Sequence, residues 1–269
     1  MIIIAREESA NTRDMHEFKV QLVVYYLCEY RQTSTALLAR LLDQSVHSAS
    51  GFISNLLKKG ILRRLKNPHT KHSLVGLYEG AKPYMPESVD CSLIFKKTVR
   101  KNIAHHLAIQ EATFKYMHQC SRITYSSLPR AIRKEHTRKP LTENDVPYRP
   151  HTMELVPDTL LELKSGKIAA LEMELTDKES PNYIYWIFSQ YAREIAGSNP
   201  LSAVVFVFPP DEKGGETSKT MDAYKRLLAQ EHWPVIQRKL VPGHIIYKRT
   251  GDYFTPDKGI RKCFLFDIL

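Results

Sequence analysis

Apolar residues in the first third of the chain recur at the three-to-four-residue spacing of amphipathic helices. This spacing predicts one helix over residues 15–30 and a second that begins after Ser34, a residue type that caps helix N-termini. A third helix is expected from Ser45 to a stop at Gly60, with Val46, Ala49, Ile53, Leu56 and Leu57 on its inward side. Two short strands over 61–66 and 73–78 should follow as a hairpin.

Three short helices followed by a hairpin resemble a winged helix, a fold that binds DNA in many proteins and contacts other proteins in some. The outward side of the third helix carries small and polar side chains, which let a helix enter the major groove. The hairpin carries basic residues suited to phosphate or minor-groove contacts. The expected DNA-binding residues of this region are His47, Ser48, Ser50, Asn55, Lys58, Arg63, Arg64, Lys66, His69 and Lys71.

An apolar stripe beyond a proline-containing linker at 80–92 predicts a long helix over residues 95–121. Glu111 comes one turn after Leu107, close to this stripe. A buried acid at this place would need a compensating partner, whereas an acid at the edge of the stripe would reach water. The pattern is compatible with both placements of the Glu111 side chain.

Residues 154–175 contain two alternating stretches that are typical of strands, separated by a polar turn that ends in Gly166. A three-residue loop with Gly166 in the left-handed conformation would place Asp158 opposite Glu172. Strand alternation then puts Glu174 on the same face as Glu172. The pattern predicts three carboxylates in one small region of a sheet.

Carboxylates that lie close together repel each other, and oxygen ligands of this kind suit Mg²⁺ or Mn²⁺. One interpretation of the acidic hairpin is therefore a divalent-metal site formed by Asp158, Glu172 and Glu174. The other interpretation is that Glu162 and Glu174 lie on a solvated sheet face and that Asp158 ends a strand that begins at Pro157. The pattern alone is compatible with both.

Predicted helices and strands alternate in the C-terminal part of the chain, as they do in α/β domains. A helix is expected from the Ser180-Pro181 pair to Gly197, with aromatic residues that either pack on the sheet or stack on bases. We therefore expect an α+β chain with two domains, 1–85 and 91–269. The remaining predicted elements are a strand over 201–208, a helix over 218–230 and strands over 244–248 and 263–267.

The charge balance points to a polyanion as partner. The chain has 269 residues, with 39 lysines and arginines against 29 acidic residues, and its net charge is +10. The basic residues form clusters, which predicts binding to DNA or RNA, and the alternative is a basic surface that contacts only solvent. Residues 127–150 are expected to form a surface loop over DNA, with contacts from Arg130, Arg133, Lys134 and Arg138.

Several classes of protein are disfavoured by the sequence. No apolar run approaches the ~18 residues that a membrane span requires, and the apolar start is followed at once by charged residues, unlike a secretory signal. The four cysteines lack zinc-finger spacing, so reduced thiols are expected. We expect a cytoplasmic protein that does not insert into membranes.

The pair Pro157-Asp158, followed by Glu172-Met173-Glu174, resembles the PD-(D/E)xK signature of restriction-endonuclease-like proteins. Glu174 stands where this signature usually has a lysine, as in some restriction endonucleases with Glu-x-Glu. The resemblance implies a restriction-endonuclease-like domain that uses Mg²⁺ or Mn²⁺ to hydrolyse a DNA phosphodiester bond.

Roles for individual residues also follow from this resemblance. Asp158, Glu172 and Glu174 would hold the metal ion, and Glu174 would act as a ligand or as the base. Glu111 would contribute from the upstream helix, and Tyr191 and its neighbour Gln190 would lie near the scissile phosphate. The implied catalytic residues are therefore Glu111, Asp158, Glu172 and Glu174.

The order of winged helix, acidic hairpin and a helix containing Tyr191 also resembles the replication-relaxation proteins and the MobC-type mobilisation relaxases of plasmids and conjugative elements. This resemblance implies an endonuclease that nicks one strand at an origin of transfer, with double-stranded DNA and relaxosome or coupling proteins as partners. The missing lysine leaves an alternative, a non-catalytic DNA-binding repressor or replication accessory protein with a degenerate nuclease fold.

Overall fold

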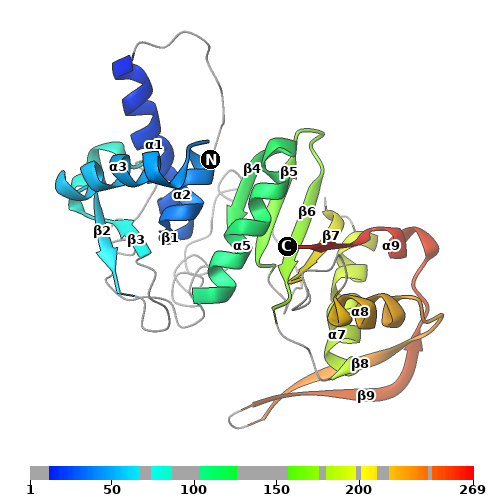
Figure 1. Cartoon of the computed structure of the whole chain (residues 1–269). Helices are drawn as coiled ribbons and strands as arrows, with labels where there is room; N and C mark the ends of the chain where they lie inside the picture. The colour runs from blue at the N-terminus through cyan, green and yellow to red at the C-terminus, as the bar shows by residue number, and fades with distance from the viewer. Residues whose placement is uncertain are drawn as a thin grey trace. The chain divides into compact units, whose positions relative to one another are not determined.

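The computed structural model describes residues 12–66, 74–86, 103–125, 157–175, 180–197, 201–210, 218–241 and 244–269. The chain divides into two compact units, the first comprising 1–115 and 121–124 and the second 116–120 and 125–269. Each unit contains helices and strands, which confirms the expected mixture of the two (Figure 1). The division differs from the predicted boundary between 85 and 91, because the helix that begins at Ile103 belongs mainly to the first unit.

The first unit begins with three helices and contains a small antiparallel sheet. The sheet has the strand order β1-β3-β2, with β2 and β3 as a hairpin. The helices α1 to α3 and the strands β2 and β3 lie where the sequence predicts them, whereas β1 was not predicted. The bounds are Thr12–Tyr30 for α1, Gln32–Ser34 for β1, Thr35–Leu41 for α2, Val46–Lys58 for α3, Leu62–Leu65 for β2 and Leu74–Leu77 for β3.

Helix ends in this unit follow from side-chain caps. The Ser34 hydroxyl oxygen accepts a hydrogen bond from the Leu37 amide at 3.2 Å, and Ser45 caps α3 through the Ser48 amide at 3.2 Å. Gly60, with φ of 67°, follows the end of α3 as predicted. The prediction that Val46 faces inward is wrong, since this first residue of α3 is 54% exposed. Its side chain leans back toward the helix N-terminus, beyond the buried face.

Helix α5, Ile103–Tyr116, packs on α1 and β1 through buried polar contacts. The Tyr26 hydroxyl donates to Gln110 at 3.0 Å, and the Gln110 amide donates to the carbonyl of Gln32 at 3.0 Å. Another contact joins His106 Nε2 to the Tyr30 carbonyl at 2.9 Å. A short 3-10 helix, η1 over Glu79–Tyr84, occupies part of the predicted linker, and a second, η2 over Met117–Gln119, follows α5.

The larger sheet is mixed, with the strand order β10-β7-β6-β5-β4, and its strands β5, β6, β7 and β10 belong to the second unit. The β5 and β6 strands form an antiparallel hairpin, while β6 and β10 run parallel to β7, which lies between them. The bounds are Cys120–Tyr125 for β4, Thr159–Leu163 for β5, Ile168–Met173 for β6, Leu201–Phe208 for β7 and Phe264–Ile268 for β10.

Helices α7, Pro181–Ala196, and α8, Lys219–Leu228, supply the apolar core that covers one face of this sheet. Phe188 of α7 and Phe206 of β7 are both fully buried there, with ring centroids 5.9 Å apart. A separate two-stranded ribbon of β8, Trp233–Val241, and β9, His244–Phe254, packs on α7 (Figure 1). Strand β8 and the short helix α9, Lys258–Lys262, were not predicted.

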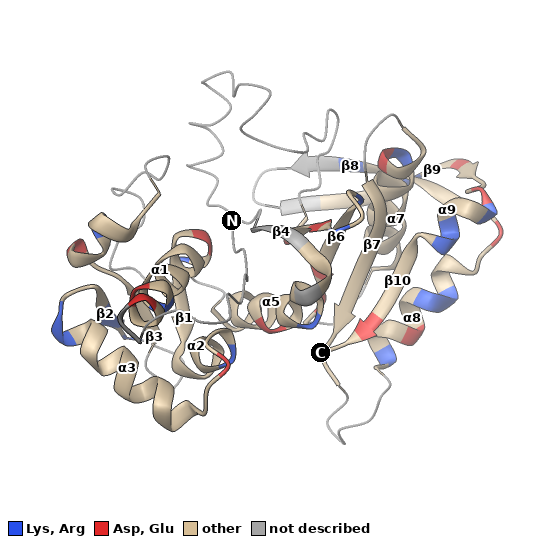
Figure 2. Cartoon of the chain, turned by 90° about the horizontal axis from the view of Figure 1, so that it is seen from above, with Lys and Arg blue, Asp and Glu red and all other residues tan. Residues whose placement is uncertain are grey.

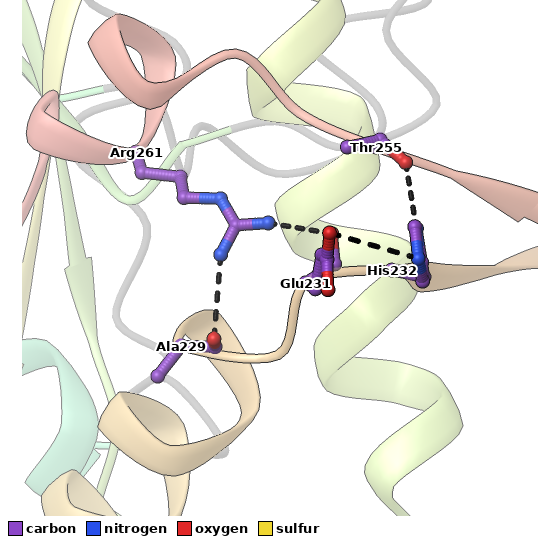
Figure 3. A network of polar contacts seen from close by, with 5 residues as sticks. All are labelled: Ala229, Glu231, His232, Thr255 and Arg261. Carbon is purple, nitrogen blue, oxygen red and sulfur yellow. Dashed lines mark hydrogen bonds and ion pairs between the residues drawn. The ribbon is translucent and has the colours of Figure 1, made fainter.

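Arg261 joins α9 to the end of α8 (Figure 3). Its guanidinium donates to the carbonyl oxygens of Leu228, Ala229 and Glu231 at 3.2, 3.4 and 2.7 Å. It also lies 5.7 Å from the centre of the Trp233 ring. One arginine thereby satisfies carbonyl groups that the end of a helix leaves without intrahelical partners.

We predict that Gly80→Ala destabilises the first unit by about 1–3 kcal/mol. A Cβ atom at residue 80 would lie 2.7 Å from the Gly60 carbonyl oxygen, so the backbone of one segment must move. Urea denaturation measures the change. Gly51→Ala is the matched control, because its added methyl group meets nothing within 4 Å and should stabilise α3 by up to about 1 kcal/mol. Equal stabilities of the two variants would contradict the prediction.

Candidate functional site

The acidic hairpin has the predicted register. Leu163 N donates to Lys167 O at 2.8 Å across the turn, and Gly166 has the left-handed φ of 79°. Thr159 pairs with Leu171, so the next pair along the hairpin, one residue further from the turn, brings Asp158 beside Glu172. A carboxylate oxygen of Asp158 accepts a hydrogen bond from the Met173 amide at 2.9 Å. The prediction that these residues lie side by side is therefore confirmed.

Glu172 and Glu174 are buried side chains, exposed by 8% and 4%. They alternate with Met173 and share the face of β6 that carries Ala170, a member of the core under α7 and α8. The interpretation of a solvated face is therefore wrong for Glu174, and Glu162, the other glutamate of that interpretation, is half-buried. A buried carboxylate must find hydrogen-bond donors in the protein, because it has lost those of water.

Tyrosines from α7 and α8 surround these carboxylates. The Tyr191 hydroxyl donates a hydrogen bond to Glu172. Burial, and then the negative charge of the nearby Glu174, raises the pKa of the Tyr224 hydroxyl. Burial also raises the pKa of Tyr183, with further contributions from Glu174, Glu172 and Asp158. All three acids of the hairpin thus act on Tyr183 and lie in one region of the second unit.

The donor chemistry of this region suits Mg²⁺ or Mn²⁺, since all of its acidic groups offer oxygen atoms. Within the described part of the chain, however, no three His, Cys, Asp or Glu side chains are placed to hold a metal ion together. Asp158 and Glu172 instead accept hydrogen bonds from Met173 and Tyr191. In this arrangement Asp158, Glu172 and Glu174 form a carboxylate–tyrosine network with Tyr183, Tyr191 and Tyr224.

Glu111 lies in the first unit and forms an ion pair with Arg40, whose Nη1 is 3.0 Å from the glutamate Oε1. The Glu111 side chain is 51% exposed, which confirms the placement at the edge of the apolar stripe. The Arg40 guanidinium also lies 5.1 Å from the centre of the Phe114 ring. The described contacts of Glu111 are thus with α2, and the three hairpin acids belong to the other unit.

A second candidate site is the outward side of α3. His47, Asn55 and Lys58 are exposed along one side of this helix, and Figure 2 shows no acidic residue on it. The Ser48 amide and hydroxyl take part in the Ser45 cap, while the Ser50 hydroxyl donates to the Val46 carbonyl at 2.7 Å. The two serines therefore have local contacts, and the other three side chains are available to a partner.

Strand β2 adds basic side chains next to α3. Arg64 and Lys66 are exposed, whereas Arg63 is half-buried with its guanidinium 5.8 Å from the centre of the Tyr78 ring. Burial lowers the pKa of Arg63. The other predicted DNA-binding residues lie outside the described residues, namely His69, Lys71, Arg130, Arg133, Lys134 and Arg138.

The sequence did not indicate that Tyr183 and Tyr224 belong to the carboxylate network. Tyr191 was expected near the reacting phosphate, and the structure places it on Glu172. Tyr224 has a helical spacing of three from Met221, another buried residue, so the periodicity of α8 places it in the core. Which β-strand it faces depends on how the helix and the sheet pack together, and that information is absent from local periodicity.

No family model matches the chain, and searches of curated proteins and of solved structures find no match either. In the ranges that the structure describes, no helix combines the length and apolar character needed to cross a membrane. The described cysteines, Cys28, Cys120 and Cys263, are half-buried and do not form disulfides with one another.

We predict that Tyr191→Phe lowers the free energy of unfolding by about 1–3 kcal/mol, because buried Glu172 loses a hydrogen-bond donor. Thermal unfolding of the full chain measures the loss. Tyr185→Phe, at another buried tyrosine of α7, is the matched control and should change stability less. Replacing both partners, as Tyr191→Phe with Glu172→Leu, should recover part of the loss. Equal effects of the two tyrosine substitutions would show that the hydroxyl of Tyr191 does not stabilise the fold.

Proposed function

We propose that the chain is a DNA-binding protein whose first unit is a winged helix, with α3 as the helix that enters the major groove. The observation that carries this proposal is the exposed row of His47, Asn55 and Lys58 on α3. Lysine and asparagine side chains contact phosphates and base edges, and α3 has no acidic residue to repel the DNA. Strand β2, with exposed Arg64 and Lys66, would contact the adjacent backbone.

Local charge supports DNA rather than protein as the partner of this surface. Between Gln32 and Lys66 the chain has six lysines and arginines and a single acidic residue, Asp43. A surface of this kind binds polyanions through release of counterions. A protein partner would not require such an excess of one sign.

Nicking of one DNA strand by the second unit is a second candidate function. It is favoured by the adjacency of Asp158, Glu172 and Glu174, whose sequence context resembles that of PD-(D/E)xK nucleases. By that resemblance the protein would use Mg²⁺ or Mn²⁺ as cofactor, and by the resemblance to MobC-type relaxases it would act at an origin of transfer. The present contacts of these carboxylates favour instead the non-catalytic alternative, in which the network stabilises a degenerate nuclease fold and the protein is a repressor or a replication accessory protein.

The full chain should bind duplex DNA with a strong dependence on salt. Arg64→Gln and Lys66→Gln should each flatten the slope of log K against log salt by about one unit, because each removes one phosphate contact. Fluorescence anisotropy with a labelled random-sequence duplex measures this. Lys82→Gln, at an exposed lysine of η1, is the control and should leave the slope unchanged. Absence of binding at low salt would contradict the proposed function.

Nicking can be tested with a supercoiled plasmid that carries a DNA site obtained by selecting sequences that the protein binds. A nuclease should relax it in Mn²⁺ or Mg²⁺ and not in EDTA, and Asp158→Asn should abolish relaxation while leaving binding intact. Mn²⁺ should also raise the melting temperature of the wild-type chain and not that of Asp158→Asn. If plasmid relaxation and the melting temperature are unaffected by Mn²⁺, the non-catalytic alternative is correct. DNA binding by the first unit is tested separately and can stand without nicking.

A further inference from the structure

The β8–β9 ribbon is a two-stranded sheet of its own, and only one of its faces is anchored in the second unit. On the anchored face, Tyr247 packs against Tyr183 and Trp186 of α7, with ring centroids 5.1 and 5.4 Å apart. Arg238 lies on the same face, because it pairs with Tyr247, and its guanidinium is 5.6 Å from the centre of the Trp186 ring. These contacts hold the ribbon rigidly on α7.

The opposite face of the ribbon carries polar, basic and apolar side chains. Gln237 pairs directly with Lys248, and both side chains are exposed. Ile246 lies two residues from Lys248 on the same face and is 37% exposed. Of the arginines in the two strands, Arg238 and Arg249 belong to the anchored face, where Arg249 Nε donates to Asn182 Oδ1 at 3.0 Å, so among the described side chains Lys248 is the basic residue of the outward face. Figure 1 shows that the strands of the ribbon extend beyond α7.

We propose that this outward face is a second DNA-binding surface, in which the ribbon enters the major groove of duplex DNA. A two-stranded antiparallel ribbon fits the major groove, which is about 12 Å wide. Gln237 can donate to and accept from a base edge, Lys248 can bind a phosphate or a guanine, and Ile246 can contact a thymine methyl group. The exposed ammonium group of Lys248 on this face complements the negative charge of DNA.

The choice of DNA as the ligand rests on the proposed function. The outward face of the ribbon itself shares no residue with α3 or β2. A protein with two such surfaces binds DNA more tightly than either unit does alone, since the second contact forms at a high effective concentration. The ribbon would therefore add affinity to the contacts of the first unit.

The test uses the full chain and a labelled random-sequence duplex, with anisotropy measured over a series of salt concentrations. Lys248→Gln should flatten the salt slope by about one unit, and Ile246→Ser should weaken binding severalfold with little change of slope. The matched control is Lys225→Gln on α8, an exposed lysine of the same unit, where Figure 2 shows other basic positions. It should change neither the slope nor the affinity. Circular dichroism checks that each variant is folded.

Several outcomes would overturn the inference and leave the proposed function intact. Equal slopes for Lys248→Gln and Lys225→Gln, while Arg64→Gln still flattens the slope, would show that the ribbon does not contact the duplex. If Lys248→Gln loses affinity for single-stranded DNA and keeps its affinity for the duplex, the ribbon binds a different ligand. Dissociation of a dimer by Ile246→Ser, with duplex binding unchanged in Lys248→Gln, would make the ribbon an interface between copies of the chain. Failure of the wild-type chain to bind any duplex would refute the proposed function, and this inference with it.

Discussion

The burial of two glutamates on β6 is the constraint on which the second unit depends. Transfer of a carboxylate from water into a protein interior costs on the order of several kcal/mol per ion unless donors replace the lost hydration. Tyr191 provides such a donor to Glu172, and Tyr183 and Tyr224 approach the same acids from α7 and α8. The fold must therefore place both helices on one face of the sheet with a defined rotation, and apolar packing alone would not require that rotation.

A comparable constraint fixes α5 in the first unit. It explains why the division between the two units differs from the predicted domain boundary. The contacts of α5 with α1 and β1 are made by polar side chains, among them His106, Gln110 and Thr113. Periodicity identifies apolar residues as the packing face and treats such residues as outward. Because polar residues make up part of the buried face of α5, periodicity alone does not show that this helix packs on α1 and β1. The resemblance to PD-(D/E)xK proteins assigned Glu111 to the acidic hairpin, whereas the structure pairs it with Arg40.

Local rules predicted the acidic hairpin well, because its register depends on the turn and its alternation on the strand. Gly166 and the pairing of Thr159 with Leu171 follow from those rules. Strand β8 was missed because Arg238 occupies an inward position where an apolar residue would be expected. Its guanidinium packs on Trp186, and this contact comes from a helix more than forty residues away in the sequence. Local alternation contains no information about such a partner.

Arginines that pack on aromatic rings change how the net charge of +10 should be interpreted. Arg40, Arg63, Arg238 and Arg261 each lie between 5.1 and 5.8 Å from a ring centre. A planar guanidinium is weakly hydrated and stacks well, so these residues stabilise helix and strand contacts as well as carrying charge. Lysine keeps its ammonium group in water on a flexible stem. Both segments that we propose to bind DNA contain a packed arginine and an exposed lysine. Arg63 and Lys66 belong to the β2 segment, while Arg238 and Lys248 lie on opposite faces of the β8–β9 ribbon. The packed arginines stabilise the fold, so the salt dependence of binding should follow the exposed basic residues, including Arg64, and not the total charge.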